Sequence, residues 1–250
     1  MGRRLFLATI ENGVSEAVSA LAGLPVELHS VPVSRITPCQ DAGELSRIAA
    51  GLNGFDWILF TSANAVAVFF SLLPAPAVEP FPRIACVGPN TAEHVKKLGH
   101  RVDFVSPEHT GDGFADAFAR MHGAPPPAVL LPRPEKMGSD LVGRLTRAGV
   151  KVTECVIYRT EPLPPGQPPV PAFTHTDLFV FMSPSGARHF CRRHAIPAHA
   201  PVFAIGATTA GTIRELGCAN VNVAEESSRD GLVDAIRRFL DNEHTNEEKT

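Results

Sequence analysis

The chain repeats part of itself at an offset of about 120 residues. Gly88, followed by Pro-Asn-Thr-Ala, recurs 118 residues later as Gly206, followed by Ala-Thr-Thr-Ala. The Asp-Gly pair at Asp112 recurs at the same offset at Asp230, again within an amphipathic stretch. Solenoid repeats are shorter, about 20–50 residues, so a unit of this length indicates two similar domains.

Two further pairs of segments extend the repeat. Phe60–Asn64 corresponds to Phe181–Ser185, and Leu7–Glu11 corresponds to Leu131–Glu135. Leu7–Glu11 and Leu131–Glu135 each begin a short strand–helix–strand piece. Phe60–Asn64 and Phe181–Ser185 each begin a longer piece. These pieces alternate along the chain as short, long, short and long, which predicts two related α/β lobes.

Short apolar runs alternate with amphipathic stretches of about ten residues. The runs predicted as buried strands are Leu5–Thr9, Trp57–Thr61, Ile84–Val87, Val129–Leu131, Leu178–Met182 and Val202–Ile205. Continuous apolar runs between helical patterns are typical of βαβ units whose parallel sheet is covered on both faces. The predicted fold class is therefore α/β, with a parallel sheet in each lobe.

Two proline-containing segments are predicted to connect the lobes. Residues 33–41 contain Pro38 and no helical pattern, and residues 162–171 contain six prolines. Proline fixes φ and removes a hydrogen-bond donor, so the second segment is expected to be a stiff extended strap. One lobe would lie between the connectors and the other would combine both ends of the chain. A cut near Pro125–Pro127 is the alternative.

Charge and hydropathy argue against several classes of protein. The net charge is −3, and the last ten residues alone carry it, so the remainder is neutral and lacks the basic excess of a nucleic-acid binder. The apolar stretch 65–78 is interrupted by Ser71, Pro74 and Pro76 and is too short to span a membrane. Five cysteines without close pairs predict reduced thiols in a cytosolic protein.

Gly88 and Gly206 each follow a predicted strand at the start of a helix. Glycine allows a tight turn and close approach of a ligand, and Thr91 and Thr209 can cap the helices. The first backbone N–H groups of a helix favour an anion. Plain capping is the alternative, but two equivalent motifs would both face one crevice at the carboxyl ends of the strands, which favours ligand binding.

Hydroxyl side chains follow two other predicted strands. Thr61, Ser62 and Asn64 form one cluster, and Ser183 and Ser185 form the other. Their O–H and N–H groups can bind carboxylates, and helix capping is again the alternative. The Gly-x-Ser-x-Gly turn of a serine nucleophile is absent from both clusters.

Two more motifs carry chemistry. Tyr158, the only tyrosine, ends a predicted strand just before the proline-rich strap, where a phenol can donate a proton to a leaving group. The alternative is aromatic packing. His189, Cys191 and His194 are residue types that bind zinc, but they lie among arginines without a second cysteine pair, so a solvated basic helix face is favoured. Nucleotide-binding and metalloprotease motifs are absent.

The blocks at Phe60–Val66, Val87–Ala92, Tyr158–Thr160, Phe181–Ser185 and Ile205–Ala210 together resemble the uroporphyrinogen-III synthase family. The resemblance covers roughly residues 5 to 240. It implies two flavodoxin-like parallel-sheet lobes joined by a two-stranded linker. Residues 1–34 and 172–241 would form lobe 1 and residues 39–161 lobe 2. Residues 35–38 and 162–171 would be linkers, and 242–250 a disordered tail.

The resemblance also implies a reaction, which is the cyclisation of hydroxymethylbilane with inversion of ring D and loss of water. It implies no metal and no organic cofactor. The implied partners are the substrate and, in a transient hand-over, the preceding bilane-forming enzyme. The expected enzyme is a cytoplasmic monomer that binds neither nucleic acid nor membrane.

Site residues follow from the motifs and the resemblance. Tyr158 is expected nearest the leaving group. The expected substrate-binding residues are Thr61, Ser62, Asn64, Gly88, Thr91 and Arg133 in one lobe, and Ser183, Ser185, Gly206, Thr208 and Thr209 in the other. Many family members carry an arginine after the first strand, where this chain has Ala8-Thr9-Ile10-Glu11. Arg133 occupies the equivalent place in the repeat.

Two other functions fit the same residues. A non-catalytic two-lobed protein that binds an anion or a tetrapyrrole would use the repeat and the hinge equally well. A degenerate family member is the other alternative, motivated by the missing arginine. Replacement of Tyr158 by phenylalanine should reduce turnover by an enzyme and leave a pure binder almost unaffected.

Overall fold

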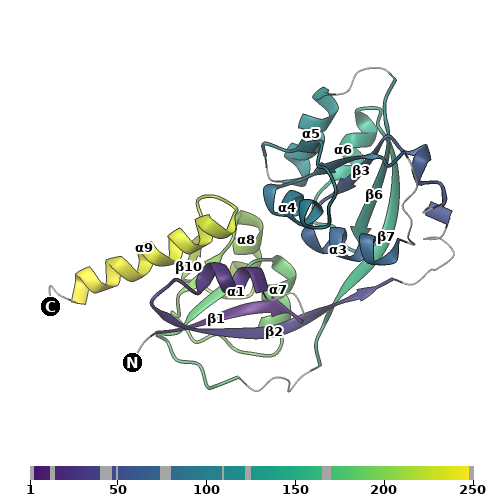
Figure 1. The fold of residues 1–250 in the computed structure, drawn as a ribbon. Coiled ribbons are helices and arrows are strands. Elements are labelled where there is room, and N and C mark those ends of the chain that lie inside the picture. The colour runs from purple at the N-terminus through teal and green to yellow at the C-terminus, as the bar shows by residue number, and fades with distance from the viewer. Residues whose placement is uncertain are drawn as a thin grey trace. The chain divides into compact units, whose positions relative to one another are not determined.

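A computed structural model describes residues 3–11, 15–39, 47–48, 50–73, 80–108, 110–121, 125–164 and 170–247. Tertiary contacts divide the chain into two compact units (Figure 1). Unit 1 comprises Met1–Ile36 and Thr160–Thr250, and unit 2 comprises Thr37–Arg159. The N-terminal segment therefore packs with the C-terminal part of the chain.

The sheet of unit 1 has the strand order β2-β1-β8-β9-β10, and every neighbouring pair is parallel. Its central strands are continuous apolar runs and almost completely buried, as expected for a sheet covered on both faces. The strands are β1 (Arg3–Ile10), β2 (Val26–Pro38), β8 (Leu178–Phe181), β9 (Val202–Ala204) and β10 (Val221–Val223).

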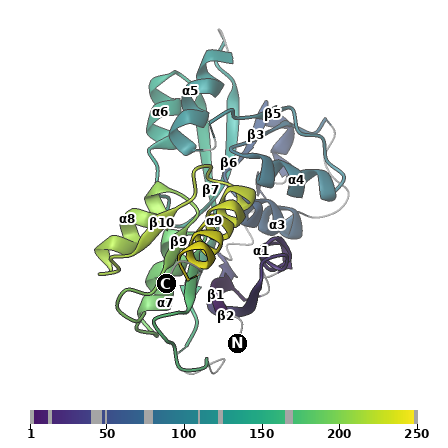
Figure 2. The same ribbon diagram turned by 90° about the vertical axis from the view of Figure 1, so that its left-hand side faces the viewer.

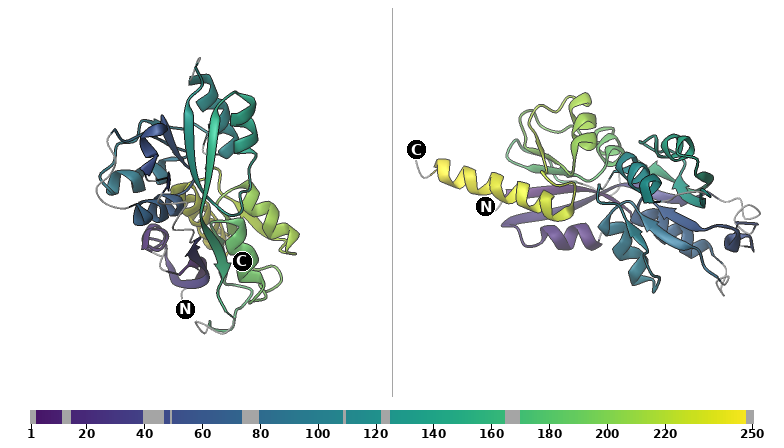
Figure 3. Two further views of the ribbon diagram at one scale, coloured as in Figure 1. Left: turned by 90° about the vertical axis from the view of Figure 1, so that its right-hand side faces the viewer. Right: turned by 90° about the horizontal axis from the view of Figure 1, so that it is seen from above.

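Helices cover both faces of this sheet. The view from above in Figure 3 shows α1 (Ser15–Leu21) and α9 (Arg229–Glu247) on one side, and α7 (Pro184–Cys191) and α8 (Ala207–Glu215) on the other. Successive β1 side chains point to opposite faces. Leu5 and Leu7 therefore pack in the core beneath α1 and α9, whereas Phe6 and Ala8 pack beneath α7 and α8.

The sheet of unit 2 has the strand order β7-β6-β3-β4-β5, again with every neighbouring pair parallel. Trp57 and Leu59 of β3 point toward one face, and Ile58 and Phe60 point toward the other. The strands are β3 (Trp57–Phe60), β4 (Arg83–Cys86), β5 (Phe104–Val105), β6 (Ala128–Pro134) and β7 (Lys151–Pro162).

Two helix pairs cover this second sheet, as Figure 2 shows. Helices α5 (Gly111–Met121) and α6 (Leu141–Arg147) cover the face that holds Trp57 and Leu59. Helices α3 (Ala63–Leu72) and α4 (Pro89–Lys97) cover the other, where the Phe60 and Phe69 rings pack edge to face. A short 3₁₀ helix, η1 (Leu52–Gly54), precedes β3.

Strands β2 and β7 each continue from one unit into the other. In unit 1 the backbone N–H of Leu163 donates to the carbonyl of Val33, at 2.9 Å. In unit 2 the N–H of Cys39 donates to the carbonyl of Ile157, also at 2.9 Å. The boundary between the units falls inside β7, at Arg159 and Thr160, before the proline-rich segment begins.

The prediction of an α/β fold with a largely parallel sheet is confirmed. The prediction of a disordered tail from residue 242 is wrong for residues 242–247, which continue α9. Glu243 accepts a hydrogen bond of 3.0 Å from the Arg3 guanidinium and forms an ion pair with it, which ties this part of α9 to β1. Residues 165–169 of the predicted strap and residues 248–250 of the predicted tail lie outside the described residues.

Candidate functional site

Tyr158 and Ser62 meet at the carboxyl end of the unit 2 sheet. The phenolic oxygen of Tyr158, on β7, lies 3.2 Å from the hydroxyl oxygen of Ser62, which follows β3. Tyr158 is 4% exposed, whereas Ser62 is half-buried. Ligands of open parallel sheets bind at this end of the strands, so the pair lies where a substrate is expected.

Ser62 is also the N-cap of α3. Its hydroxyl accepts a hydrogen bond from the backbone N–H of Ala65 at 3.1 Å, and its backbone is extended, with φ −157° and ψ 155°. The capping interpretation is thus correct for Ser62, and capping fixes the hydroxyl beside Tyr158. Thr61 precedes the cap and Asn64 is the second residue of α3, and both are half-buried.

A hydroxyl oxygen has two acceptor positions and one donor hydrogen. Ala65 occupies one acceptor position of Ser62, and the Tyr158 O–H can occupy the other. In that arrangement Ser62 can donate its own hydrogen to a third group, such as a ligand. The pair can therefore pass a proton from the buried phenol through Ser62.

Burial raises the pKa of Tyr158, and the hydrogen bond with Ser62 opposes part of that rise. The charged phenolate is poorly stabilised in an apolar environment, so the phenol keeps its proton at neutral pH. This protonation state suits a proton donor.

The start of α4 differs from the prediction in one respect. Its N-cap is Gly88, without a side-chain cap hydrogen bond, and Pro89 is its first residue. Thr91 lies inside the first turn and is 6% exposed, so its predicted capping role is wrong. Proline is well suited to the first helical position because its missing N–H would have no acceptor within the helix.

Arg133 lies near the end of β6, and the adjoining Pro134 is paired with Tyr158 in the parallel register of β6 and β7. The Arg133 guanidinium is already held within unit 2. Its Nε lies 2.5 Å from a carboxylate oxygen of Glu154. Its Nη1 donates to the carbonyls of Pro134 and Glu135, at 2.8 and 3.1 Å. Sequence reasoning missed Glu154, because only strand pairing brings it to Arg133.

Unit 1 contains the second cluster of hydroxyl groups. Ser183 is the N-cap of α7, with φ −160° and ψ 153°, close to the angles of Ser62. Its hydroxyl accepts from the Gly186 N–H at 3.1 Å and lies 3.3 Å from the hydroxyl of Ser185. The described contacts of Ser183 include no phenol, so the two clusters differ in the group that accompanies the serine.

The start of α8 parallels that of α4. Gly206 is the N-cap without a side-chain hydrogen bond, and a Cβ at this position would come within 2.7 Å of the Ser227 hydroxyl oxygen. Glycine is therefore favoured by a close neighbour and not by its φ of −176°. Thr208 is exposed, whereas Thr209 is 3% exposed and again lies inside the first turn.

The histidine–cysteine motif of α7 is not the solvated face that was predicted. His189 is 9% exposed, and its Nδ1 lies 2.6 Å from the hydroxyl oxygen of the buried Ser34. Cys191 contacts Cys218, and the His194 ring packs against Phe190. Among the described residues, no group of three or more His, Cys, Asp or Glu side chains is placed to hold a metal ion.

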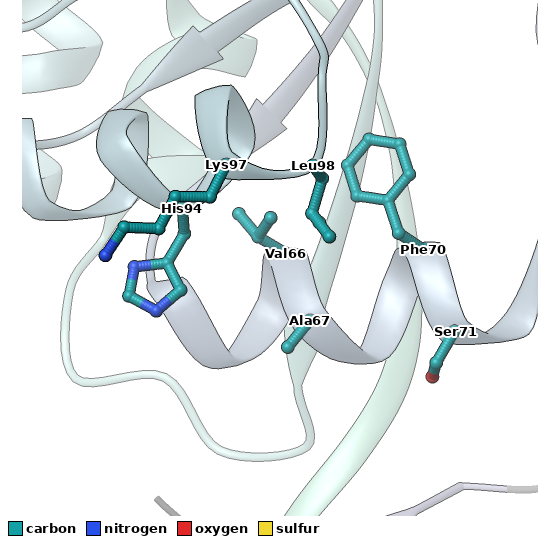
Figure 4. A pocket seen from close by; sticks show the side chains of 7 residues that line it. All are labelled: Val66, Ala67, Phe70, Ser71, His94, Lys97 and Leu98. Carbon is teal, nitrogen blue, oxygen red and sulfur yellow. The ribbon is translucent and has the colours of Figure 1, made fainter. Parts of the chain in front are cut away.

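A groove of about 340 Å³ lies between α3 and α4 (Figure 4). Apolar side chains line most of it, and Lys97, at one end, pairs with Glu93 at 3.4 Å. The lining residues are Val66, Ala67, Phe70, Ser71, His94, Lys97 and Leu98. None of them belongs to the predicted substrate-binding set.

The fold and these helix starts define a parallel α/β protein whose hydroxyl and backbone N–H donors gather at the carboxyl ends of its strands. The family profile described as uroporphyrinogen-III synthase HemD matches residues 15–234. The chain belongs to the uroporphyrinogen-III synthase family. The predictions of this family, and of an enzyme of tetrapyrrole biosynthesis, are confirmed.

Two relatives agree with this assignment. The uroporphyrinogen-III synthase of Synechococcus elongatus is 29% identical over 256 residues, which cover 94% of this chain and 95% of that protein. The porphyrin biosynthesis protein HemD of Ruminiclostridium josui is 24% identical over 244 residues. That match covers 94% of this chain and 48% of the relative, so the chain corresponds to about half of that protein.

Two solved structures share the fold. The uroporphyrinogen-III synthetase of Helicobacter pylori aligns with a TM-score of 0.62 at 16% identity, over 95% of this chain and 99% of that one. A mutant uroporphyrinogen III synthase of Thermus thermophilus aligns with a TM-score of 0.59 at 15% identity, over 96% and 99%. Among the described residues, the helices are all too short or too polar to span a membrane.

Proposed function

We propose that this chain converts hydroxymethylbilane to uroporphyrinogen III, closing the macrocycle with inversion of ring D and loss of water. The observation that carries the proposal is the hydrogen-bonded pair of Tyr158 and Ser62 at the start of α3. Family membership supplies the reaction, and this pair supplies a proton donor at the place where a ligand is expected.

Loss of the substrate hydroxyl group requires a proton. We assign that proton to Ser62, which donates to the leaving oxygen while Tyr158 donates to Ser62. The C–O bond breaks, water leaves and an azafulvene cation remains. The ring D carbon that already carries the methylene bridge to ring C attacks this cation, and the bond from that carbon to the bridge then breaks. The bridge carbon bonds instead to the free α-carbon of ring D, which inverts the ring, and the proton that this carbon loses on rearomatisation restores the Tyr158 phenol. Ser62 is the intermediary because Tyr158 is almost fully buried.

The substrate carries eight carboxylates, and helix starts are suited to bind them. The first N–H groups of a helix lack acceptors within the helix and carry partial positive charge. We propose that the starts of α3 and α4 in unit 2, and of α7 and α8 in unit 1, bind substrate carboxylates. The residues assigned are Thr61, Ser62, Asn64, Gly88, Thr91, Ser183, Ser185, Gly206, Thr208 and Thr209.

Arg133 is also assigned to the substrate-binding residues, on the condition that it releases Glu154. Its guanidinium is held by Glu154 and by two backbone carbonyls. A substrate carboxylate can replace Glu154 because both are carboxylates of the same geometry, and a bidentate pair with arginine is strong. We therefore propose that Arg133 exchanges Glu154 for substrate on binding.

We further propose that the two units are duplicated flavodoxin-like lobes. The strand–helix–strand piece supplies strands 1 and 2 of each unit, which are β1 and β2 in unit 1 and β6 and β7 in unit 2. The three strands of the longer piece are strands 3, 4 and 5. The observed orders are β2-β1-β8-β9-β10 and β7-β6-β3-β4-β5. Both are the order 2-1-3-4-5 of flavodoxin-like sheets. The matched caps at Ser62 and Ser183, and at Gly88 and Gly206, support the same duplication. The proposed bounds remain 1–34 with 172–241, and 39–161.

The proposed setting is a cytoplasmic monomer that receives its unstable substrate by transient hand-over from the preceding bilane-forming enzyme. The unstable substrate motivates the hand-over, because the free bilane closes by itself to isomer I. Sedimentation of the purified chain alone tests whether it is a monomer. Sedimentation with the bilane-forming enzyme tests the hand-over.

A coupled assay tests the reaction. Freshly generated hydroxymethylbilane is given to the purified chain, and the oxidised products are separated as isomers I and III. Predominant isomer III is expected, and Tyr158→Phe should return the products toward isomer I. Isomer I alone, formed at the spontaneous rate, would reject the enzyme and leave a tetrapyrrole-binding protein or a degenerate family member.

A further inference from the structure

Folding brings two cysteines of unit 1 together. Cys191 is the last residue of α7, and Cys218 follows the turn that ends α8 at Gly217, where φ is +91°. The two residues are 27 positions apart in the sequence, yet both pack against the same core cluster and their side chains interact with each other. Both are free thiols in the structure.

The two thiols lie at the edge of the same core cluster. Both pack against the buried side chains beneath α7 and α8, which include Phe190 and Ile213. This packing holds the helix ends in place, so the thiols do not depend on a mobile loop to meet. Each cysteine is also partly exposed, which gives a small oxidant access to the sulfur atoms.

Their interaction makes the two thiols chemically unequal. The interaction with Cys191 lowers the pKa of Cys218, whereas the interaction with Cys218, together with burial, raises the pKa of Cys191. The thiolate is the reactive form of cysteine. Cys218 is therefore suited to attack an oxidant, and the neighbouring Cys191 is suited to resolve the product.

We propose that Cys191 and Cys218 form a redox modification site that closes to a reversible disulfide in the presence of a hydroperoxide. The Cys218 thiolate attacks one oxygen of hydrogen peroxide, the O–O bond breaks, and one water leaves after protonation. Cys218 is then a sulfenic acid. The Cys191 sulfur attacks that sulfur, the S–O bond breaks, and a second water leaves. Two thiols are oxidised by two electrons, and one peroxide is reduced to two waters.

The disulfide would join the end of α7 to the end of α8. Closing this loop restricts the unfolded chain, so oxidation is expected to stabilise unit 1 against heat. The starts of the same two helices hold Ser183 and Gly206, while the cross-link lies at their opposite ends. The test of the modification therefore needs no enzyme activity and is independent of the proposed function.

Peptide mapping of the full chain tests the proposal. The reduced protein is treated with equimolar hydrogen peroxide, alkylated with N-ethylmaleimide under denaturing conditions, and digested without reductant. The expected result is a peptide that links Cys191 to Cys218, a mass lower by two hydrogen atoms, and alkylation of the other three cysteines only. Dithiothreitol should restore alkylation of all five.

Single variants assign the roles. Cys191→Ser should stop at a Cys218 sulfenic acid, which dimedone traps, and Cys218→Ser should remain unoxidised in the same time. The matched control is Cys39→Ser, because Cys39 is also partly exposed but lies in unit 2; it should form the disulfide like the parent. Before oxidation, Cys218 should react with iodoacetamide at pH 7 at least about fivefold faster than Cys191.

Three results would overturn the proposal. The first is alkylation of all five cysteines after peroxide treatment. The second is a disulfide that links a different pair or two chains. The third is a parent protein whose Cys218 stops at the sulfenic acid. A rise in melting temperature that requires both cysteines and disappears with dithiothreitol would support it even if one serine variant folds poorly.

Discussion

The hydroxyl oxygens of Tyr158 and Ser62 lie 3.2 Å apart, and the same serine caps α3 through the N–H of Ala65. One side chain thus joins the start of a helix to the only tyrosine of the protein. The cap orients the serine and the serine orients the phenol. Substitutions at these two positions should therefore have separable effects.

Tyr158→Phe is expected to lower kcat for isomer III by about 10²-fold or more, because it removes the proton donor and keeps the buried ring. KM should change little, since the phenol binds no carboxylate in the proposed site. Steady-state kinetics with freshly generated bilane measure both constants. An unchanged kcat would remove Tyr158 from the mechanism.

Ser62→Ala should have two effects. Loss of the α3 cap should lower the free energy of unfolding by about 1 kcal/mol, and loss of the relay should lower kcat. Ser62→Thr keeps the hydroxyl and should recover much of both. Urea unfolding and the isomer assay separate the two effects.

Ser228→Ala is the matched control for Ser62→Ala. The hydroxyl of Ser228 accepts from the Gly231 N–H at 3.0 Å at the start of α9, so the variant loses an equivalent cap outside the proposed site. Its stability should fall by a similar amount while kcat is kept. Equal losses of kcat in the two variants would mean that Ser62 acts through stability alone.

His189 should make the stability of the protein fall in mild acid. Burial, followed by the charges of Arg192 and Arg188, lowers the pKa of His189 in the folded state. The unfolded chain therefore binds this proton more readily. The stability that the neutral imidazole contributes is present above about pH 6.5 and is lost as the pH falls toward the folded pKa.

Urea unfolding between pH 7.5 and 5 measures this effect. The free energy of unfolding should decrease by at most about 1.4 kcal/mol per pH unit for this one group. His189→Asn keeps a polar partner for Ser34 and should flatten that part of the profile. An identical slope in the parent protein and in His189→Asn would contradict the prediction.

Leu7→Ala tests whether the N-terminal strand is part of unit 1. Leu7 is fully buried in β1, between β2 and β8, so the substitution should cost about 2–5 kcal/mol. Hydrogen exchange followed by mass spectrometry should show faster exchange in β1, β2 and β8. Peptides of β3 and β4 in unit 2 should keep their protection. Equal loss of protection in both units would argue against separate folding units.

Local patterns in the sequence predicted much of the fold. The apolar runs at Trp57–Thr61 and Leu178–Met182 became buried strands because a sheet covered on both faces requires continuous apolar residues. The hydroxyls after them became helix caps for an equally local reason, since a cap bonds to an N–H three residues away. Tyr158 was predicted to end its strand, but β7 continues to Pro162, and only its pairing with β6 ends at Tyr158.

Pairs of side chains that are distant in the sequence could not be predicted. Arg133 was expected to be available to a ligand, but strand pairing places Glu154 against it. The motif containing His189 was expected on a solvated face, but α7 turns this residue toward Ser34 in the core. In both cases the partner comes from another element, and a linear pattern carries no information on which elements become neighbours.

The sequence by itself determined the α/β class, the alternation of strands and helices, the helix starts and the family resemblance. These properties depend on hydrophobic periodicity and on contacts a few residues long. Tertiary structure alone decided that Ser62 touches Tyr158, that Cys191 meets Cys218, and that Glu243 of α9 pairs with Arg3. Those pairings form only when packing brings separate elements together, because the geometry that creates them is absent from the unfolded chain.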